Sequence, residues 1–373
     1  MKVLTLQEFT EQQSKTQDNQ HTNLIFDDCT FNFDWTINES FNVVEFSNCI
    51  FNGRFDFSKS KFVSSVHFSK CEFNYYLGFT DCDFEKKVRF HEVIFSKKVN
   101  FHNAVFNDLA DFWSSSFIKR MIFYKTDFLG TTVFSKVLFE SNVLFTYTLI
   151  EKLLILRGAK FSQGLDLSLS IISGKMSPFD IQIDNYISVL DVDNDNTYEH
   201  MVSVSGDIPD KNKRETFRIL KQQFLNQNNS IDYLKYSALE QNAYTKQLND
   251  KVWNRKAFYN NIQNYIILGL NYISNNHGKS YIRGIVFTLT VGLLFFYFSL
   301  IATDEYSFGF NNFWEATIKS VKYYFSFINP THKTNHMDEL HPNNWFYLWD
   351  FIGRAFIAYG IYQTVQAFRK FKK

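Results

Sequence analysis

Two ionisable residues inside a long apolar stretch near the C-terminus are the first candidates for chemistry. Asp350 and Arg354 are the only charged side chains in residues 345–368. Their spacing of four residues places them on one helix face, where they can pair. Ionisable groups within a membrane span usually face a bundle interior or a water path. We therefore expect a pore or gate role for Asp350 and Arg354, with snorkelling to the headgroups as the alternative, and for Gln363 and Gln366 on the same helix.

A second candidate site is the basic segment formed by residues 211–256, which holds ten Lys or Arg against four Asp or Glu. Apolar residues recur at helical spacing on both sides of the Asn-rich residues 226–229, which predicts a helical hairpin. The positive excess fits a solvated helix face, attraction to anionic lipid, or a site for a nucleotide or single-stranded oligonucleotide. For a nucleotide, the candidate ligand-binding residues are Lys211, Lys213, Arg214, Arg218, Lys221 and Lys235.

Motifs of known catalysis are absent from the sequence. It has no Walker sequence or other phosphate-binding Gly loop, and no GxSxG or HExxH. We therefore expect no enzyme activity, no catalytic residue and no cofactor. His332, His336 and His341 could reach a metal ion, but loop histidines are commonly solvated, so we predict no metal site.

The acidic residues 177–210 contain eight Asp or Glu and no Lys or Arg. Asp191, Asp193 and Asp195 have the opening spacing of a calcium loop. The Gly and Glu that such a loop needs at its sixth and twelfth positions are replaced by Asn196 and Val202. We therefore predict an acidic cap or linker.

The spacing of phenylalanine predicts the element that makes up the N-terminal half. From Phe51 to Phe145, a series of Phe residues recurs at steps of alternately six and five, which gives periods of 11 and 22. A helix needs steps of 3 and 4 and a strand needs steps of 2, so neither explains this pattern. We predict a right-handed quadrilateral β-solenoid over residues 24–176 with 22 residues per coil. One Phe would point inward from each side, and stacked coils would align columns such as Phe46, Phe68, Phe90, Phe112 and Phe134.

The position two residues before each Phe is mostly small or β-branched, and all four cysteines occupy it: Cys29, Cys49, Cys71 and Cys82. We read them as buried apolar residues without a redox or metal role. Residues 1–23 lack the apolar core of a signal peptide, so we expect them to form a cytoplasmic N-terminal cap.

Two stretches in the C-terminal region are long and apolar enough to suggest membrane spans. Residues 284–303 carry no charge over 20 positions, the length that the hydrocarbon core requires. Residues 345–368 begin with aromatic side chains and are followed by basic ones. Lys279, Arg283 and the basic tail predict that both ends are cytoplasmic and that the loop 304–344 is outside.

Two further segments of this region are amphipathic. Residues 257–280 fit a helix that lies in the membrane interface. Residues 310–328 fit either a re-entrant pore helix, which is tolerated at membrane depth only inside protein or beside water, or an exposed interfacial helix. No sequence like the carbonyl-lined potassium filter occurs, so potassium selectivity is not expected. The predicted segments are thus an N-terminal cap (1–23), the solenoid (24–176), an acidic cap or linker (177–210), a basic helical hairpin (211–256), an interfacial helix (257–280) and a two-helix pore-like domain (281–373).

The repeat resembles that of pentapeptide-repeat proteins, which have a central Leu or Phe and a small residue two positions earlier. The chain departs from that family in alternating steps of five and six. The runs YALEQNAYTKQL, SNNHGKSYIRG, FINPTHK and DFIGRAFIAYGIYQTVQAFRKF are similar to motifs of pentapeptide-repeat membrane proteins with an ion-channel-like C-terminal domain. Some antiphage systems, including Hailong-type systems, use membrane effectors controlled by a nucleotide or oligonucleotide. The resemblance implies a multi-pass protein of the bacterial inner membrane with such a role.

These observations lead to one main hypothesis and two competing ones. We expect a ligand-responsive ion channel or pore, formed by a homo-oligomer and most simply a tetramer, because two helices per chain cannot enclose a pore. The first alternative is a membrane-tethered scaffold whose solenoid binds a protein partner. The second is topoisomerase protection through DNA mimicry, which the near-neutral net charge of +1 disfavours.

Overall fold

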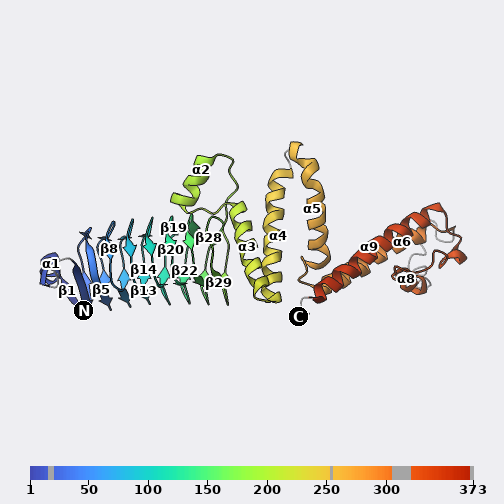
Figure 1. Ribbon diagram of the computed structural model, residues 1–373. Coiled ribbons are helices and arrows are strands. Elements are labelled where there is room, and N and C mark those ends of the chain that lie inside the picture. Colours follow the sequence, from blue (N-terminus) through green and yellow to red (C-terminus); the bar gives the residue numbers. More distant parts are fainter. Residues whose placement is uncertain (16–20, 253–254, 305–320, 370–373) are drawn as a thin grey trace. The chain divides into compact units, whose positions relative to one another are not determined.

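The structure is a computed structural model that describes all residues except 16–20, 253–254, 305–320 and 370–373. The chain forms two compact units, Met1–Gln227 and Asn228–Lys373. The first unit is a β-solenoid with helices at its ends, and the second unit is helical (Figure 1).

The solenoid has four sides, each a ladder of parallel strands. The first side runs through β1 (Lys2–Leu4), β3 (Cys29–Phe31), β6 (Ile50–Phe51), β10 (Glu72–Phe73), β14 (Ile94–Phe95), β18 (Ser116–Phe117), β22 (Leu138–Phe139), β26 (Lys160–Phe161) and β30 (Gln182–Ile183). The second side consists of β4 (Trp35–Thr36), β7 (Phe55–Asp56), β11 (Leu77–Gly78) and β15 (Val99–Asn100), followed at the same spacing by β19 (Met121–Tyr124), β23 (Val143–Thr146) and β27 (Leu165–Asp166).

The other two sides are joined through the long strand β5 (Ser40–Ser47). One of them contains β8 (Lys61–Phe62), β12 (Asp83–Phe84), β16 (Val105–Phe106), β20 (Asp127–Phe128), β24 (Leu149–Ile150) and β28 (Ile171–Ile172). The other contains β2 (Thr22–Asp27), β9 (Val66–Ser69), β13 (Val88–His91), β17 (Ala110–Asp111), β21 (Thr132–Val133), β25 (Leu153–Ile155) and β29 (Lys175–Ser177). The last strand of the solenoid in chain order is β30 of the first side, so the solenoid ends at Ile183, beyond the predicted limit of 176.

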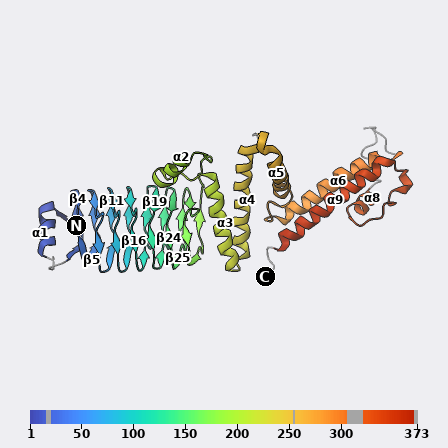
Figure 2. The ribbon, with the colours of Figure 1, turned by 45° about the horizontal axis from the view of Figure 1, so that its top comes forward.

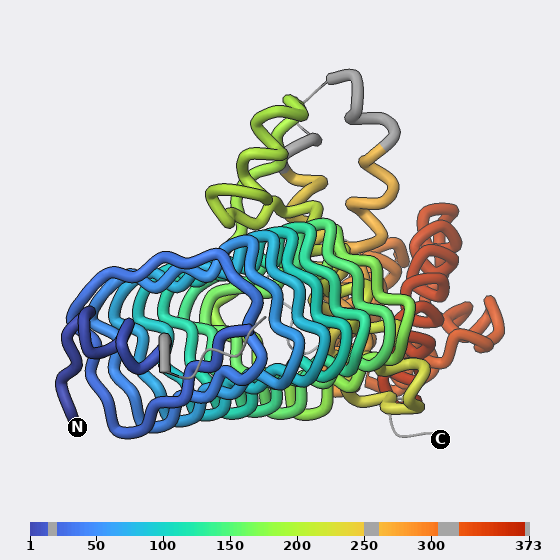
Figure 3. The backbone as a smooth tube through the Cα atoms, turned by 60° about the vertical axis from the view of Figure 1, so that its left-hand side comes forward, coloured from blue at the N-terminus to red at the C-terminus, as the bar shows by residue number. Residues whose placement is uncertain are grey.

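The strand register confirms the coil length of 22 residues. Phe46 pairs with Phe68, which in turn pairs with Phe90. In this column the rings of Phe46, Phe68, Phe90, Phe112 and Phe134 stack with centroids 4.8 to 5.2 Å apart. All four cysteines are free and buried, as predicted. Figure 3 shows the resulting stack of coils.

Backbone conformation explains the alternation of five and six. In the five-residue steps from Phe46 onward, a residue with positive φ lies two residues after the first Phe: Asn48, Lys59, Lys70, Asp81, Glu92, Asn103, Ser114, Lys125, Lys136 and Tyr147. A single left-handed residue turns the chain sharply, so five residues complete these sides. The sides without it turn over more residues and need six.

Helices close both ends of the coil stack. At the start, α1 (Leu6–Lys15) buries Phe9 completely against the first coil, with ring centroids 4.9 Å from Phe26 and 5.0 Å from Trp35. At the other end, α3 (Asp210–Asn226) buries Phe217, Leu220 and Phe224. These caps cover coil edges that would otherwise expose unpaired backbone groups.

The second unit contains α4 (Ser230–Val252), α5 (Arg255–Asn275), α6 (Tyr281–Ile301), α8 (Val321–Phe327), the short 3₁₀ helix η4 (Asp338–Leu340) and α9 (Asn344–Phe368). The helices α4 and α5 lie side by side, and α6 packs against α9. Of the predicted helix over 310–328, residues 310–320 lie outside the described residues. Among the described helices, α6 alone is long and apolar enough to cross a membrane, with a mean hydropathy of 2.2 over its best window.

Candidate functional site

A basic cavity lies on the flank of the solenoid, in the first unit. It has a volume of about 600 Å³ and is lined by three successive coils and by residues 203–205. The cationic lining residues are Lys98, Lys119 and Arg120. Pockets of a few hundred Å³ with a few convergent polar groups are typical of small-ligand sites.

The repeat brings the basic side chains of this cavity together. Lys97 and Lys98 precede Lys119 and Arg120 by 22 residues, the length of one coil. Equivalent positions of neighbouring coils are about 4.8 Å apart, so Lys97 lies one coil from Lys119, and Lys98 lies one coil from Arg120. Among the described residues neither Lys98 nor Lys119 forms an ion pair, and both are exposed. The cavity can therefore offer two available ammonium groups to an anion.

The outer wall of the cavity is the lateral segment, residues 194–208, which we predicted as a solvated acidic cap or linker. It contains α2 (Asp195–His200), which is labelled in Figure 2, and the π-helix η1 (Met201–Ser205). The π-helix lies against β19 and β23. Val202 and Ile208 of this segment are completely buried with Leu144 of the solenoid. Burying two such side chains stabilises the contact by roughly 3–6 kcal/mol, an upper estimate, so the wall is well anchored.

Polar contacts fix the same segment to the coils. The Arg120 guanidinium donates to the Ser205 carbonyl at 2.6 Å and pairs with Asp207 at 2.9 Å. The hydroxyls of Tyr124 and Tyr147 donate to the Glu199 carboxylate at 3.2 and 2.7 Å. The hydrogen bond to Glu199 raises the pKa of Tyr147 to about 12. This phenol therefore remains a donor throughout the physiological pH range.

Aromatic side chains complete the cavity. The rings of His102 and Tyr124, one coil apart, have centroids 4.5 Å from each other. Burial, with smaller contributions from Lys125 and Lys98, lowers the pKa of His102, so its ring is neutral at pH 7. Neutral rings beside lysines can stack on a flat base while the lysines bind phosphate, which is the chemistry of nucleotide recognition.

The six basic residues predicted to bind a ligand are engaged elsewhere. Lys211 lies over the ring of Tyr198 at 3.7 Å, and Lys213 donates to the Tyr186 carbonyl at 3.2 Å. Arg218 pairs with Glu215 at 2.5 Å. Arg214 and Lys221 also have partners within the chain, and Lys235, in the second unit, lies 5.4 Å from the ring of Tyr236.

The calcium-like acidic residues also have other roles. Asp191 accepts a hydrogen bond from the backbone nitrogen of Lys211 at 2.8 Å, at the start of α3. Asp195 is the first residue of α2, whose N-terminus is capped by the side chain of Asn194. In the described part of the chain, the three aspartates do not form a metal-like cluster.

The predicted pore residues of α9 occupy three different environments. Asp350 is 2% exposed and binds Arg354 at 2.5 Å, as the spacing of four predicted, and His332 at 2.7 Å. Gln363 is 4% exposed, whereas Gln366 is exposed. Of the four residues, Asp350 and Gln363 thus face the interior of their own unit.

Gln363 belongs to a polar cluster that ties α9 to α5. Its side-chain nitrogen donates to Asn271 Oδ1 at 3.0 Å, and its Oε1 accepts from the side-chain nitrogen of Asn275 at 2.5 Å. The Tyr359 hydroxyl also donates to Asn271, at 2.9 Å. Composition alone did not reveal this cluster, because its members come from helices about 90 residues apart in sequence.

Three comparisons with known proteins found no match for the chain. Its sequence matches no model of a protein family and no curated protein, and its structure matches no solved structure. The resemblance to pentapeptide-repeat membrane proteins is therefore carried by the sequence motifs quoted above.

Proposed function

We propose that the chain is one subunit of a membrane channel or pore that responds to a cytoplasmic nucleotide or oligonucleotide. The cavity beside Lys98 and Lys119 is the ligand site, and the helices of the second unit form the membrane part. By the resemblance given above, the protein acts in the bacterial inner membrane as an antiphage effector.

The pairing of α6 with α9 supports two membrane spans. Small residues bring the helices together: Gly284 lies against Thr364, and Gly360 lies against Thr288. A Cβ added at Gly360 would be 2.3 Å from the Thr288 hydroxyl oxygen. Close approach through Gly and Thr is typical of helix pairs in membranes. Because α9 packs along α6, a bilayer crossed by α6 would contain both.

The observation that carries the proposal is the position of α8 beside the middle of α6. The Tyr324 hydroxyl donates to the Leu289 carbonyl at 3.0 Å, and Ile328 would be 3.2 Å from a Cβ at Gly292. Leu289 is 12 residues from the end of α6, which corresponds to about 18 Å at 1.5 Å per residue. A short helix at that depth is typical of a re-entrant segment beside a pore.

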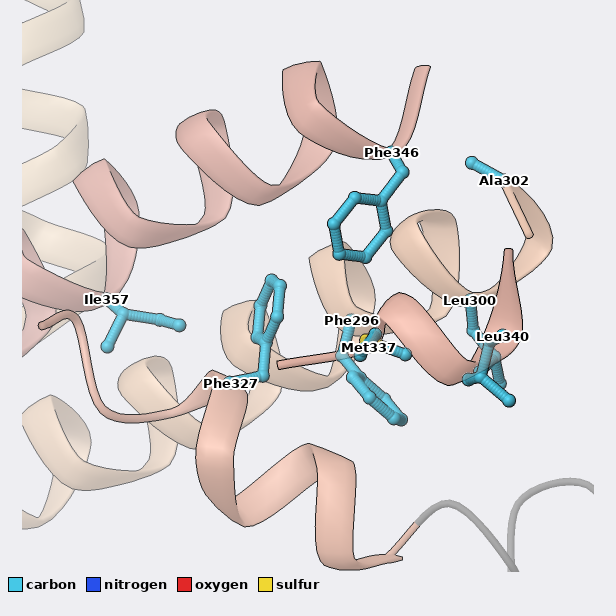
Figure 4. Packing of buried hydrophobic residues seen from close by; sticks show 8 residues of the cluster. All are labelled: Phe296, Leu300, Ala302, Phe327, Met337, Leu340, Phe346 and Ile357. Carbon is cyan, nitrogen blue, oxygen red and sulfur yellow. The ribbon is translucent and has the colours of Figure 1, made fainter. Parts of the chain in front are cut away.

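The core of the membrane part also includes α8. Phe327 is completely buried and points into the space between α6 and α9, where Phe296 and Ile357 also lie (Figure 4). A Cβ at Gly353 would be 2.6 Å from the Phe327 ring, so glycine at this position makes room for α8. The fold-back is therefore supported by packing on both helices.

The outward faces of α6 and α9 are apolar and support an oligomer in lipid. On α6, Val286 and Leu293 are 56% and 52% exposed, and on α9, Phe351 is 71% exposed. Two helices cannot surround a conducting path, so several subunits, most simply four, must assemble. Exposed Gln366 is free to face such a path. Asp350 and Arg354 hold the re-entrant loop in this proposal.

The competing proposal is a membrane-tethered scaffold whose solenoid binds a protein. The internal bonding of Asp350 and Gln363 favours it, because a simple anchor needs its polar groups satisfied within the helix pair. Ion conduction separates the two proposals.

The test is current through planar bilayers containing the purified full chain, with and without ATP or a short oligodeoxynucleotide. We expect discrete currents that the ligand changes. A Lys98→Ala, Lys119→Ala double variant should conduct with a much weaker response to the ligand. Silence of a folded, oligomeric protein under every condition would refute the pore. Currents indifferent to every ligand would refute the sensing role.

A further inference from the structure

Three potential metal ligands converge where the loop after α8 meets α9. One ring nitrogen of His332, one ring nitrogen of His336 and a carboxylate oxygen of Asp350 all lie within 4.8 Å of one another. The side chains of His332 and Asp350 are 4% and 3% exposed. In the described residues, no other group of three such side chains is this compact.

The hydrogen bonds of the two histidines orient both rings in the same way. His332 Nδ1 lies 2.6 Å from the Asn329 carbonyl oxygen, and His336 Nδ1 lies 3.1 Å from the Lys333 carbonyl oxygen. A carbonyl only accepts, so each Nδ1 carries the hydrogen and donates it. In a neutral imidazole the other nitrogen, Nε2, then presents a lone pair. Such bonds to backbone carbonyls are the usual support of metal-binding histidines.

With both Nδ1 atoms donating to backbone carbonyls, neither Nε2 atom of the two neutral rings has a hydrogen-bond donor among the described residues. His332 Nε2 is 2.7 Å from Asp350 Oδ1, so two electron-rich atoms face each other unless a proton or a metal ion lies between them. His336 Nε2 is buried and has no hydrogen-bond partner among the residues that the structure describes. A buried nitrogen left unpaired costs about 1–3 kcal/mol. One cation bound by all three groups would satisfy both nitrogens together.

Arg354 completes the surroundings of the carboxylate. Its guanidinium binds Asp350 Oδ2 at 2.5 Å, which leaves Oδ1 directed at the histidines. The carboxylate thus lies between a fixed cation and the two imidazoles. Such an outer hydrogen bond orients a ligand and keeps it ionised.

We propose that His332 Nε2, His336 Nε2 and Asp350 Oδ1 bind one divalent transition-metal ion, with Zn²⁺ as the preferred ion. Two imidazoles and one carboxylate are a common zinc set, and water fills the fourth position. Bonds of about 2.0–2.2 Å place tetrahedral ligands roughly 3.3 Å apart, so His332 and Asp350 would separate slightly while His336 approached. The ion would join the loop to α9. This proposal does not depend on whether the chain conducts ions.

The experiment measures metal binding by the full chain in detergent. The protein is stripped with a chelator, titrated with Zn²⁺ and analysed for metal content, and Co²⁺ serves as a spectroscopic probe. We expect one Zn²⁺ per chain and the visible absorption of four-coordinate Co²⁺. His336→Ala should lower Zn²⁺ affinity at least tenfold. This variant removes only one ring, and size-exclusion chromatography reports whether it remains folded.

His341→Asn is the matched control. His341 lies in the same loop but outside the cluster, is exposed and has a positive φ, which Asn tolerates. This variant should bind Zn²⁺ like the original chain. The proposal is wrong if the original chain takes up no stoichiometric Zn²⁺, or if His336→Ala and His341→Asn bind it equally well. In the first case, a protonated His332 paired with Asp350 explains the geometry.

Discussion

Replacing the two lysines of the flank cavity should weaken nucleotide binding without unfolding the solenoid. The change is Lys98→Ala combined with Lys119→Ala. Both side chains are exposed, and neither forms an ion pair in the described part of the chain. Their removal therefore deletes two positive charges and leaves no buried group without a hydrogen bond.

The size of the effect follows from the exposure of the lysines. An ammonium about 4 Å from a phosphate oxygen interacts with about 1 kcal/mol in bulk water and about 4 kcal/mol near a protein surface. Because both side chains are exposed, screening and lost side-chain entropy reduce each contribution to about 0.5–1 kcal/mol. The double variant should lose about 1–2 kcal/mol. Since 1.4 kcal/mol corresponds to a factor of ten, affinity should fall roughly 5- to 30-fold.

Isothermal titration calorimetry of the full chain in detergent, with ATP and a short oligodeoxynucleotide, measures this change. The matched control is Lys86→Ala with Lys87→Ala. These lysines precede Lys97 and Lys98 by 11 residues, half a coil, and so lie on the opposite side of the solenoid. Higher salt should weaken binding by the original chain more than by the cavity variant. Equal losses in both double variants, or no loss in the cavity variant, would refute the assignment of the cavity.

Two further predictions concern stability. Phe90→Ala should destabilise the solenoid by about 3–5 kcal/mol, because Phe90 is fully buried between two stacked rings. The control Ile94→Ala, at a residue that is 43% exposed, should change the stability of the solenoid by less than about 0.5 kcal/mol. Hydrogen exchange of the coils measures both changes. Asn275→Ala removes the donor to Gln363 and should destabilise the second unit by about 1–3 kcal/mol in thermal unfolding. The control Gln366→Ala, at an exposed residue, should have little effect on this stability. Equal effects of the two variants would contradict the polar link between α5 and α9.

Local regularity made the solenoid predictable. Each coil contacts only its neighbours, so a sequence period of 22 becomes a spatial period directly. The stack of Phe68, Phe90 and Phe112 could therefore be read from spacing alone, and so could the burial of Cys49 and Cys71. The left-handed residues at the five-residue corners were not foreseen, because Lys, Glu and Tyr at these positions have no preference for positive φ.

The basic cavity could have been found in part from the sequence. The period places Lys97 and Lys98 one coil before Lys119 and Arg120, but the net charge of the segment concealed this cluster. The outer wall was not predictable. An acidic segment without a repeat gives no sign that Val202 will dock beside Leu144.

The sequence by itself thus determined the coil length and the inward residues of the solenoid, because these depend on local spacing and backbone preference. Tertiary structure decided what those elements bring together. Tyr324 contacts the middle of α6, Gln363 bonds to Asn271 of α5, and His332 and His336 meet Asp350. These contacts depend on how segments distant in sequence pack side chain against side chain, and periodicity carries no information about that.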